Sequence, residues 1–93
     1  MTKIIMFYGK ECPHCHVMLP LADRLIKEEG VEIEKLEVWH SKENADRMRK
    51  FEDLIKKSCG GELGVPTFLD EENSRAFCGE SSYEELKKWA KQK

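Results

Sequence analysis

The chain lacks any long apolar segment and any strong excess of charge of one sign. Its 93 residues include 16 basic and 18 acidic side chains, which give a formal net charge of −2. No segment approaches the roughly 20 consecutive apolar residues of a membrane-spanning helix. The balanced charge gives no reason to expect nucleic acid or an anionic membrane surface. We therefore expect no nucleic acid and no membrane among its partners.

Repeats, linkers and low-complexity blocks are also missing. The length suits one small domain with a single core, spanning residues 1–93, and a monomer is the default for this size. The N-terminus has no signal-peptide pattern, because Thr2 and Lys3 lead directly into a short apolar run. A cytoplasmic location is therefore expected. It weighs against interpreting the four cysteines as the disulfide framework of a secreted protein.

Cys12-Pro13-His14-Cys15 is the motif most able to carry chemistry. It follows a short apolar run and begins a pattern typical of a helix. Two thiols at this spacing can close a small disulfide ring or bind a metal. The unpaired N–H groups and positive dipole end of a first helical turn favour a thiolate over a thiol. Pro13 suits that turn, where a missing N–H costs nothing. The placement therefore favours redox chemistry.

Apolar periodicity predicts four strands and three helices. The expected strands are 3–8, 31–39, 65–69 and 74–78, and the expected helices are 13–29, 42–57 and 82–92. Ser41 is the expected N-cap of the second helix, and Ser82 with Glu85 forms a capping box for the third. The order βαβαββα predicts an α/β fold. Its first two strands pair in parallel, and its final hairpin places one antiparallel strand at the side.

With these motifs in this element order, the chain resembles the thioredoxin superfamily in its small thioredoxin/glutaredoxin-like form. Cys12-Pro13-His14-Cys15 matches the family's Cys-x-x-Cys site, and Pro20 matches the proline that bends the active-site helix. Gly64-Val65-Pro66-Thr67 matches the loop in which the proline is cis, and Gly79 matches a glycine before the last helix. The resemblance covers nearly the whole chain. It implies a mixed four-stranded sheet flanked by three helices.

The resemblance implies a thiol–disulfide oxidoreductase. Cys12 is the expected nucleophile, which forms a mixed disulfide with a protein or small-thiol partner, and Cys15 then resolves that intermediate. Pro13 and His14 are expected to tune the acidity of Cys12, since a protonated His14 adds positive charge nearby. No cofactor is expected beyond the Cys12–Cys15 disulfide, with glutathione as an optional cosubstrate. Electrons would come from a reductase or from glutathione.

The resemblance also implies the residues that bind substrate. A cis Pro66 directs the backbone of Val65 toward the dithiol, next to Thr67, so that an extended substrate segment can pair with it. Tyr8 and Lys10 follow the glutaredoxin style, in which a basic residue near the first cysteine helps to hold glutathione. Gly79 occupies the turn where glutaredoxins grip glutathione. The second glycine usual in that turn is missing here.

Two family features are absent from the chain. Thioredoxins place a buried Asp on the first strand to help the resolving cysteine lose its proton, and Met6 stands at that position. Glu11 stands where thioredoxins commonly have a Trp. Water, or a charged group such as Glu11 or Lys10, then has to take over the proton transfer.

The direction of electron flow stays open. The bacterial disulfide-oxidase family has the same Cys-Pro-His-Cys tetrapeptide, and its His stabilises the reduced form. The resemblance therefore implies a potential more oxidising than that of ordinary thioredoxin. A cytoplasmic location instead suits a reductase or a glutathione-linked role.

Two other function classes remain as alternatives. The first is a metal or iron–sulfur protein that uses Cys12 and Cys15 with Cys59 or Cys78, and with His14. It lacks the second Cys-x-x-Cys or His pair typical of such sites. The second alternative is a non-catalytic binding module with the same fold.

The remaining candidate residues have simple structural interpretations. Cys59 and Cys78 need not be adjacent in this fold, so free thiols are expected and a disulfide, or a regulatory Cys78, is the alternative. His16 is expected to be a solvated helix residue and His40 a surface loop residue. The two tryptophans are expected to pack in the core or at its rim; they are Trp39 and Trp89.

Overall fold

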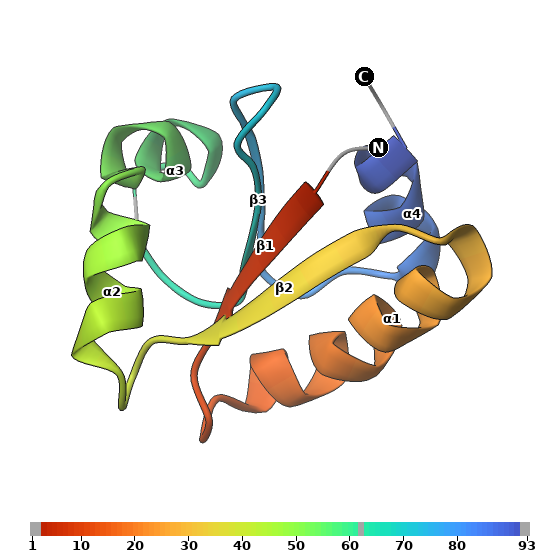
Figure 1. The fold of residues 1–93 in the computed structure, drawn as a ribbon, viewed down its shortest axis with the longest axis horizontal. Helices are drawn as coiled ribbons and strands as arrows, with labels where there is room; N and C mark the ends of the chain where they lie inside the picture. Colours follow the sequence, from red (N-terminus) through yellow and green to blue (C-terminus); the bar gives the residue numbers. More distant parts are fainter. Residues whose placement is uncertain (1–2, 62, 92–93) are drawn as a thin grey trace.

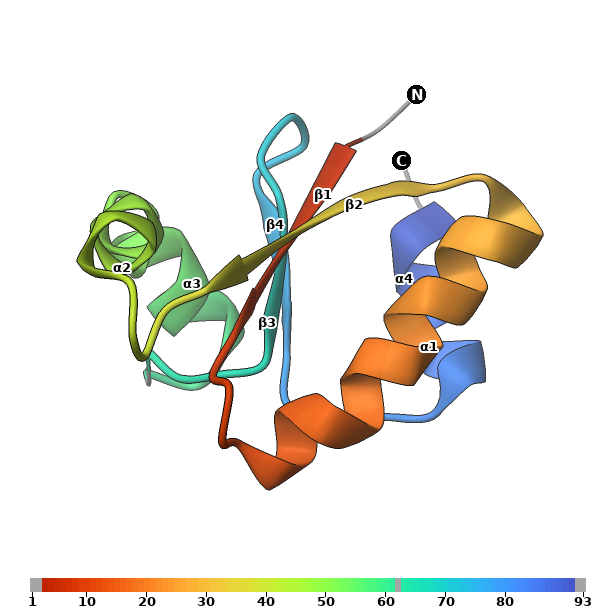
Figure 2. The same cartoon turned by 60° about the horizontal axis from the view of Figure 1, so that its bottom comes forward.

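The computed structural model describes residues 3–61 and 63–91 of the chain. The elements in these residues are β1 (Lys3–Tyr8), α1 (Pro13–Glu29), β2 (Glu32–Glu37), α2 (Lys42–Arg49), α3 (Glu52–Ser58), β3 (Thr67–Asp70), β4 (Arg75–Cys78) and α4 (Tyr83–Lys91). Helices α1 and α4 cover one face of the sheet, and α2 and α3 cover the other (Figures 1 and 2). The expected end of the last helix at residue 92 lies outside the described residues.

The four strands described here form one mixed sheet in the order β2-β1-β3-β4. Strands β1 and β2 are parallel, and β3 and β4 form an antiparallel hairpin, as the element order predicts. The edge strand β4 is antiparallel to its neighbour β3, as predicted for the final hairpin, but it runs in the same direction as β1 and β2. Strand β3 runs antiparallel to both β1 and β4 and lies inside the sheet. All four of its residues are buried whereas those of β4 are half-buried, so β4 takes the edge.

Strand β1 separates two hydrophobic cores. Ile4 and Met6 point into the core beneath α1 and α4, and Ile5 and Phe7 point into the core beneath α2 and α3. Successive side chains of a strand face opposite sides, so an unbroken apolar run is the pattern of a strand covered on both faces. These four residues are between 0% and 4% exposed.

The single helix expected over 42–57 is two helices, because the chain turns at Lys50 and Phe51 between α2 and α3. The Phe51 N–H donates to the Met48 carbonyl at 3.1 Å, which closes a tighter turn than an α-helix. The break lets Met48 of α2 and Ile55 of α3 both reach the same core. Neither glycine nor proline marks the break, so tertiary packing decides it.

The helix ends largely follow the sequence-based prediction. Ser41 Oγ accepts the Asn44 N–H at 3.2 Å, and Ser82 Oγ accepts the Glu85 N–H at 3.2 Å. Both contacts satisfy a backbone donor that the first helical turn leaves free. Gly30 ends α1 with a φ of 67°, a left-handed conformation that favours glycine.

A disulfide joins Cys59 to Cys78, so the prediction of two free thiols is wrong. Cys59 caps the C-terminus of α3 and Cys78 is the last residue of β4, with their Cα atoms 5.7 Å apart. The turn between α2 and α3 brings the two cysteines together, since α3 then packs beside β4. A single straight helix over 42–57 does not by itself predict that Cys59 lies next to Cys78.

We expect a variant with both Cys59→Ser and Cys78→Ser to unfold more easily. The free energy of unfolding should fall by roughly 3 kcal/mol, because the disulfide links residues 19 apart and so restricts the unfolded chain. Urea unfolding of the oxidised wild-type protein and of the variant measures the difference. A loss well under about 1 kcal/mol would contradict a restraining role.

Candidate active site

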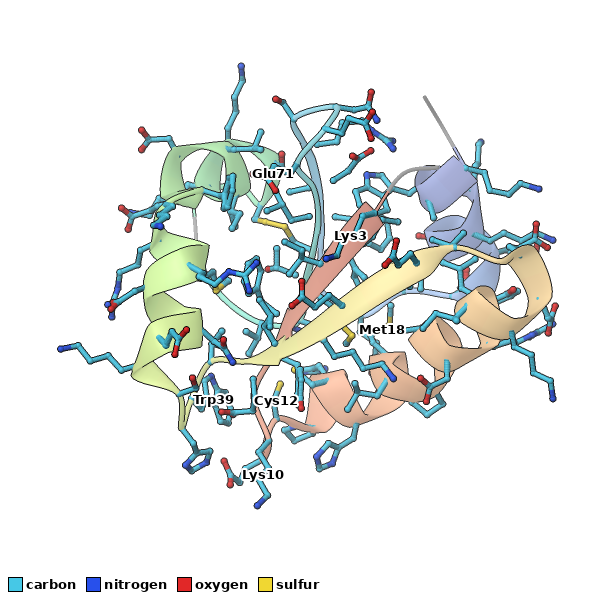
Figure 3. All side chains as sticks on the ribbon, in the orientation of Figure 1. Lys3, Lys10, Cys12, Met18, Trp39 and Glu71 are labelled. Atoms are coloured by element: carbon cyan, nitrogen blue, oxygen red, sulfur yellow. A yellow bond between two sulfur atoms is a disulfide. The ribbon has the colours of Figure 1, made fainter. Side chains whose placement is uncertain are left out.

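Cys12 lies at the point where β1 passes into α1 (Figure 3). It is the N-cap of α1, and Pro13 occupies the first helical turn. The Cys12 N–H donates to the Gly9 carbonyl at 3.1 Å, and the Cys12 carbonyl accepts the His16 N–H at 3.1 Å. Cys12 therefore lies beside the free N–H groups and the positive dipole end of a helix N-terminus.

The two thiols have different surroundings. Cys15 is fully buried, and its sulfur accepts the Gly9 N–H at 3.4 Å. Burial raises the pKa of the Cys15 thiol to about 12, and Cys12 and the charge of Glu37 add to the rise, while the Gly9 N–H opposes it. The Cys12 thiol instead faces the Val65 carbonyl at 3.9 Å. Cys15 is therefore held as a thiol, and Cys12 is the sulfur next to the Val65 backbone.

The loop before β3 forms the other side of the site. Its Val65–Pro66 peptide bond is cis. Thr67 Oγ1 donates to the Gly64 carbonyl at 2.6 Å, and the Gly79 N–H donates to the Pro66 carbonyl at 2.9 Å. A cavity of about 280 Å³ lies here, lined by residues 64–67 together with Cys59, Cys78 and Gly79. The structure thus brings Val65, Pro66, Thr67 and Gly79 together, with Val65 in contact with Cys12.

The other expected site residues lie farther from the sulfurs. Tyr8 packs against the core beneath α1 and α4. Lys10 is exposed, and its backbone N–H donates to Glu37 at 2.9 Å. His14 is exposed on α1, with its Nδ1 atom 3.7 Å from a carboxylate oxygen of Glu80. The observed polar partner of His14 is therefore Glu80.

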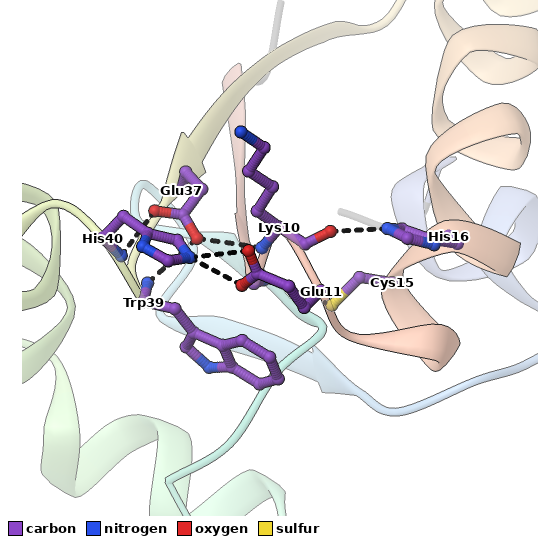
Figure 4. A network of polar contacts seen from close by, with 8 residues as sticks. Lys10, Glu11, Cys15, His16, Glu37, Trp39 and His40 are labelled. Atoms are coloured by element: carbon purple, nitrogen blue, oxygen red, sulfur yellow. Dashed lines mark hydrogen bonds and ion pairs between the residues drawn. The ribbon is translucent and has the colours of Figure 1, made fainter.

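A polar network beside Cys15 includes His16 and His40, for which the sequence predicts only surface positions (Figure 4). His16 is not merely solvated, because its Nε2 lies 2.6 Å from the Lys10 carbonyl oxygen. His40 is exposed, and its Nε2 lies 2.6 and 2.8 Å from the two carboxylate oxygens of Glu11. The Glu11 carboxylate raises the pKa of His40, which favours the imidazolium. Sequence position gives no hint of this pairing, since 29 residues separate the two.

Trp39 lies over Gly9 on the same rim. A Cβ atom at position 9 would overlap the indole ring, so glycine permits this close approach. The other side of Trp39 faces solvent, and the residue is 52% exposed. It also lines a second, smaller cavity of about 150 Å³ with Val65. Trp39 therefore packs at the rim beside Cys12, which matches the rim alternative expected from the sequence.

Metal binding finds little support in this arrangement. Among residues 3–61 and 63–91, no group of three or more His, Cys, Asp or Glu side chains is placed to hold a metal ion. Cys59 and Cys78, one of which the metal alternative requires as a ligand, are bonded to each other.

Among the described residues, no helix is both long and apolar enough to cross a membrane.

No family model and no curated protein matches the chain in sequence. A solved glutaredoxin structure from Archaeoglobus fulgidus is similar in fold, with a TM-score of 0.67 and 22% sequence identity. The similarity covers 99% of this chain and 89% of that one. The fold is thioredoxin-like. At this identity the similarity shows the fold alone, so the chemistry of the chain rests on its own residues.

The raised pKa of Cys15 predicts a stability that depends on pH. A thiol whose folded-state pKa lies above its unfolded value stabilises the fold fully below the unfolded value, 9.0, and loses that effect as pH rises toward about 12. We expect the reduced wild-type protein to lose stability relative to a Cys15→Ser variant over this interval. Denaturant unfolding of both proteins across the pH range measures the difference. A difference that is constant with pH contradicts the assignment.

Proposed function

We propose that the protein is a thiol–disulfide oxidoreductase that uses Cys12 and Cys15. The observation that carries this proposal is the contact between the Cys12 sulfur, at the N-terminus of α1, and the Val65 carbonyl 3.9 Å away. It joins a nucleophile to a backbone segment that can align a substrate. Cys15, directly behind Cys12 and held as a thiol, supplies the second sulfur.

The reaction transfers two electrons in two exchange steps. In the first, the Cys12 thiolate attacks one sulfur of a partner disulfide, the partner's S–S bond breaks, and the departing sulfur leaves as a thiolate. In the second, Cys15 loses its proton and attacks the Cys12 sulfur, which releases the second partner thiol and forms the Cys12–Cys15 disulfide. The partner is reduced and the protein is oxidised. A reductase or glutathione then returns the two electrons.

The loop before β3 is suited to align the substrate. Val65, whose carbonyl faces the Cys12 sulfur, lines the cavity of about 280 Å³. Residues of an extended chain can pair with such a backbone as an added strand. Pro66 has no N–H, and its carbonyl is taken by Gly79. We therefore expect the substrate backbone to form its hydrogen bonds with the backbone of Val65. We propose disulfides in proteins or small thiols as substrates, with Lys10 and Gly79 as contacts for glutathione if it serves as cosubstrate.

Single cysteine variants test the order of the two steps. We expect Cys12→Ser to abolish disulfide reduction, because the nucleophile is lost. We expect Cys15→Ser to form the first mixed disulfide and to stop there. Mass spectrometry after incubation with a small disulfide measures the adduct on each variant. Full turnover by Cys12→Ser would contradict the role of Cys12, and neither turnover nor adduct in the wild-type protein would support the non-catalytic module.

The reduction potential tests the proposed role of His14. Equilibration with glutathione redox buffers should place the potential above the value of about −270 mV typical of thioredoxin, because a protonated His14 adds positive charge in the first turn of α1. His14→Ala should lower the potential by roughly 30 mV, a tenfold change in the equilibrium constant. Lys27→Ala removes a positive charge from the last turn of the same helix and serves as the matched control. Equal potentials in wild type and His14→Ala would remove His14 from the proposal.

A further inference from the structure

The carboxylate of Glu37 accepts three backbone N–H groups. Glu37 is the last residue of β2. One of its oxygens accepts the Lys10 N–H at 2.9 Å and the Trp39 N–H at 3.1 Å, and the other accepts the His40 N–H at 2.7 Å (Figure 4). These donors come from two separate connections, one between β1 and α1 and one between β2 and α2. A single side chain therefore ties the two loops together.

Glu37 makes these contacts as a carboxylate. Partial desolvation raises the pKa of Glu37. The three N–H donors and the neighbouring His40 lower it by more, so the pKa lies below its ordinary value. Hydrogen bonds from N–H groups to an ionised acceptor are about twice as strong as those between neutral groups. The charge is therefore part of what holds the loops.

The turn held by Glu37 is the one that contacts both cysteines. Gly9 donates its N–H to the Cys15 sulfur and accepts the Cys12 N–H at its carbonyl. Lys10, the next residue, is bound by Glu37, and Trp39 lies over Gly9. Any shift of the Lys10 backbone is thus transmitted directly to the groups around the two sulfurs.

The residues that the sequence suggests for proton transfer at Cys15 have other surroundings. Met6 is fully buried in the core and carries no proton acceptor. The Glu11 carboxylate is bound to His40, and Lys10 reaches the network through its backbone. Among these groups, Glu37 is the carboxylate whose charge acts on the Cys15 thiol, where it raises the pKa.

We propose that Glu37 is a positioning residue for the dithiol: its carboxylate holds the Gly9–Cys12 turn against the β2–α2 connection. This inference rests on the proposed function. The length and the charge of the side chain both serve these contacts, and the charge also adds to the raised pKa of Cys15, which gives a second readout. The other charged or titratable groups that face this turn are Lys10, Glu11, Cys12, His16 and His40.

The test is a two-phase reaction with an aromatic disulfide that releases one coloured thiolate at each exchange step. The first phase reports attack by Cys12, and the second reports resolution by Cys15. Glu37→Gln removes the charge and keeps the length of the side chain. We expect its second phase to be faster at a given pH below the Cys15 pKa, with the pH profile moved to lower pH. The first phase should change less.

Two further variants separate charge from position. Glu37→Asp keeps the charge but shortens the side chain, so we expect slower reaction in both phases without a shift of the pH profile. Glu32→Gln removes an exposed carboxylate at the other end of β2 and should behave as wild type. A second phase in Glu37→Gln with wild-type rate and pH profile would overturn the charge effect.

Amide hydrogen exchange tests the contacts without any variant. The amides of Lys10, Trp39 and His40 should exchange more slowly in the wild-type protein than the exposed amides of the same loops. Rapid exchange at all three would overturn the positioning role, even if a Glu37 variant fails to fold. If wild-type protein releases no coloured thiolate in either phase, the proposed function fails. An active wild-type protein with unaffected Glu37 variants refutes only this inference.

Discussion

Burial of β1 on both faces determines where the reactive turn lies. Ile4 and Met6 pack into one core and Ile5 and Phe7 into the other, so the strand can neither slide nor rotate without exposing apolar surface. The chain leaves this strand at Tyr8 and enters α1 at Pro13. The intervening turn therefore has a defined position, and Cys12 stands at the N-terminal end of α1.

The opposite wall of the site depends on contacts between elements far apart in the chain. The turn between α2 and α3 lets α3 pack beside β4, and the Cys59–Cys78 disulfide joins their ends. The loop that carries Pro66 begins directly after this disulfide and ends in the interior strand β3. Its position is thus restrained at both ends, which keeps the Val65 carbonyl next to Cys12.

The two sulfurs differ because their surroundings differ. Both are buried, but Cys15 accepts the Gly9 N–H and has a raised pKa, whereas the Cys12 thiol faces the Val65 carbonyl. Glu37 links these surroundings to the neighbouring loop through three backbone N–H groups. One carboxylate can therefore influence both the shape of the turn and the charge near Cys15.

The sequence by itself determined the fold class, the parallel first pair of strands, the final hairpin, both serine caps and the place of Cys12 and Cys15 at the start of α1, because each follows from patterns along the chain. Tertiary structure decided the interior place of β3, the break after α2, the Cys59–Cys78 disulfide and the role of Glu37. These features join residues from separate elements. Glu37 looks like any charged strand residue in the sequence, and only folding brings the Lys10 and His40 amides to its carboxylate.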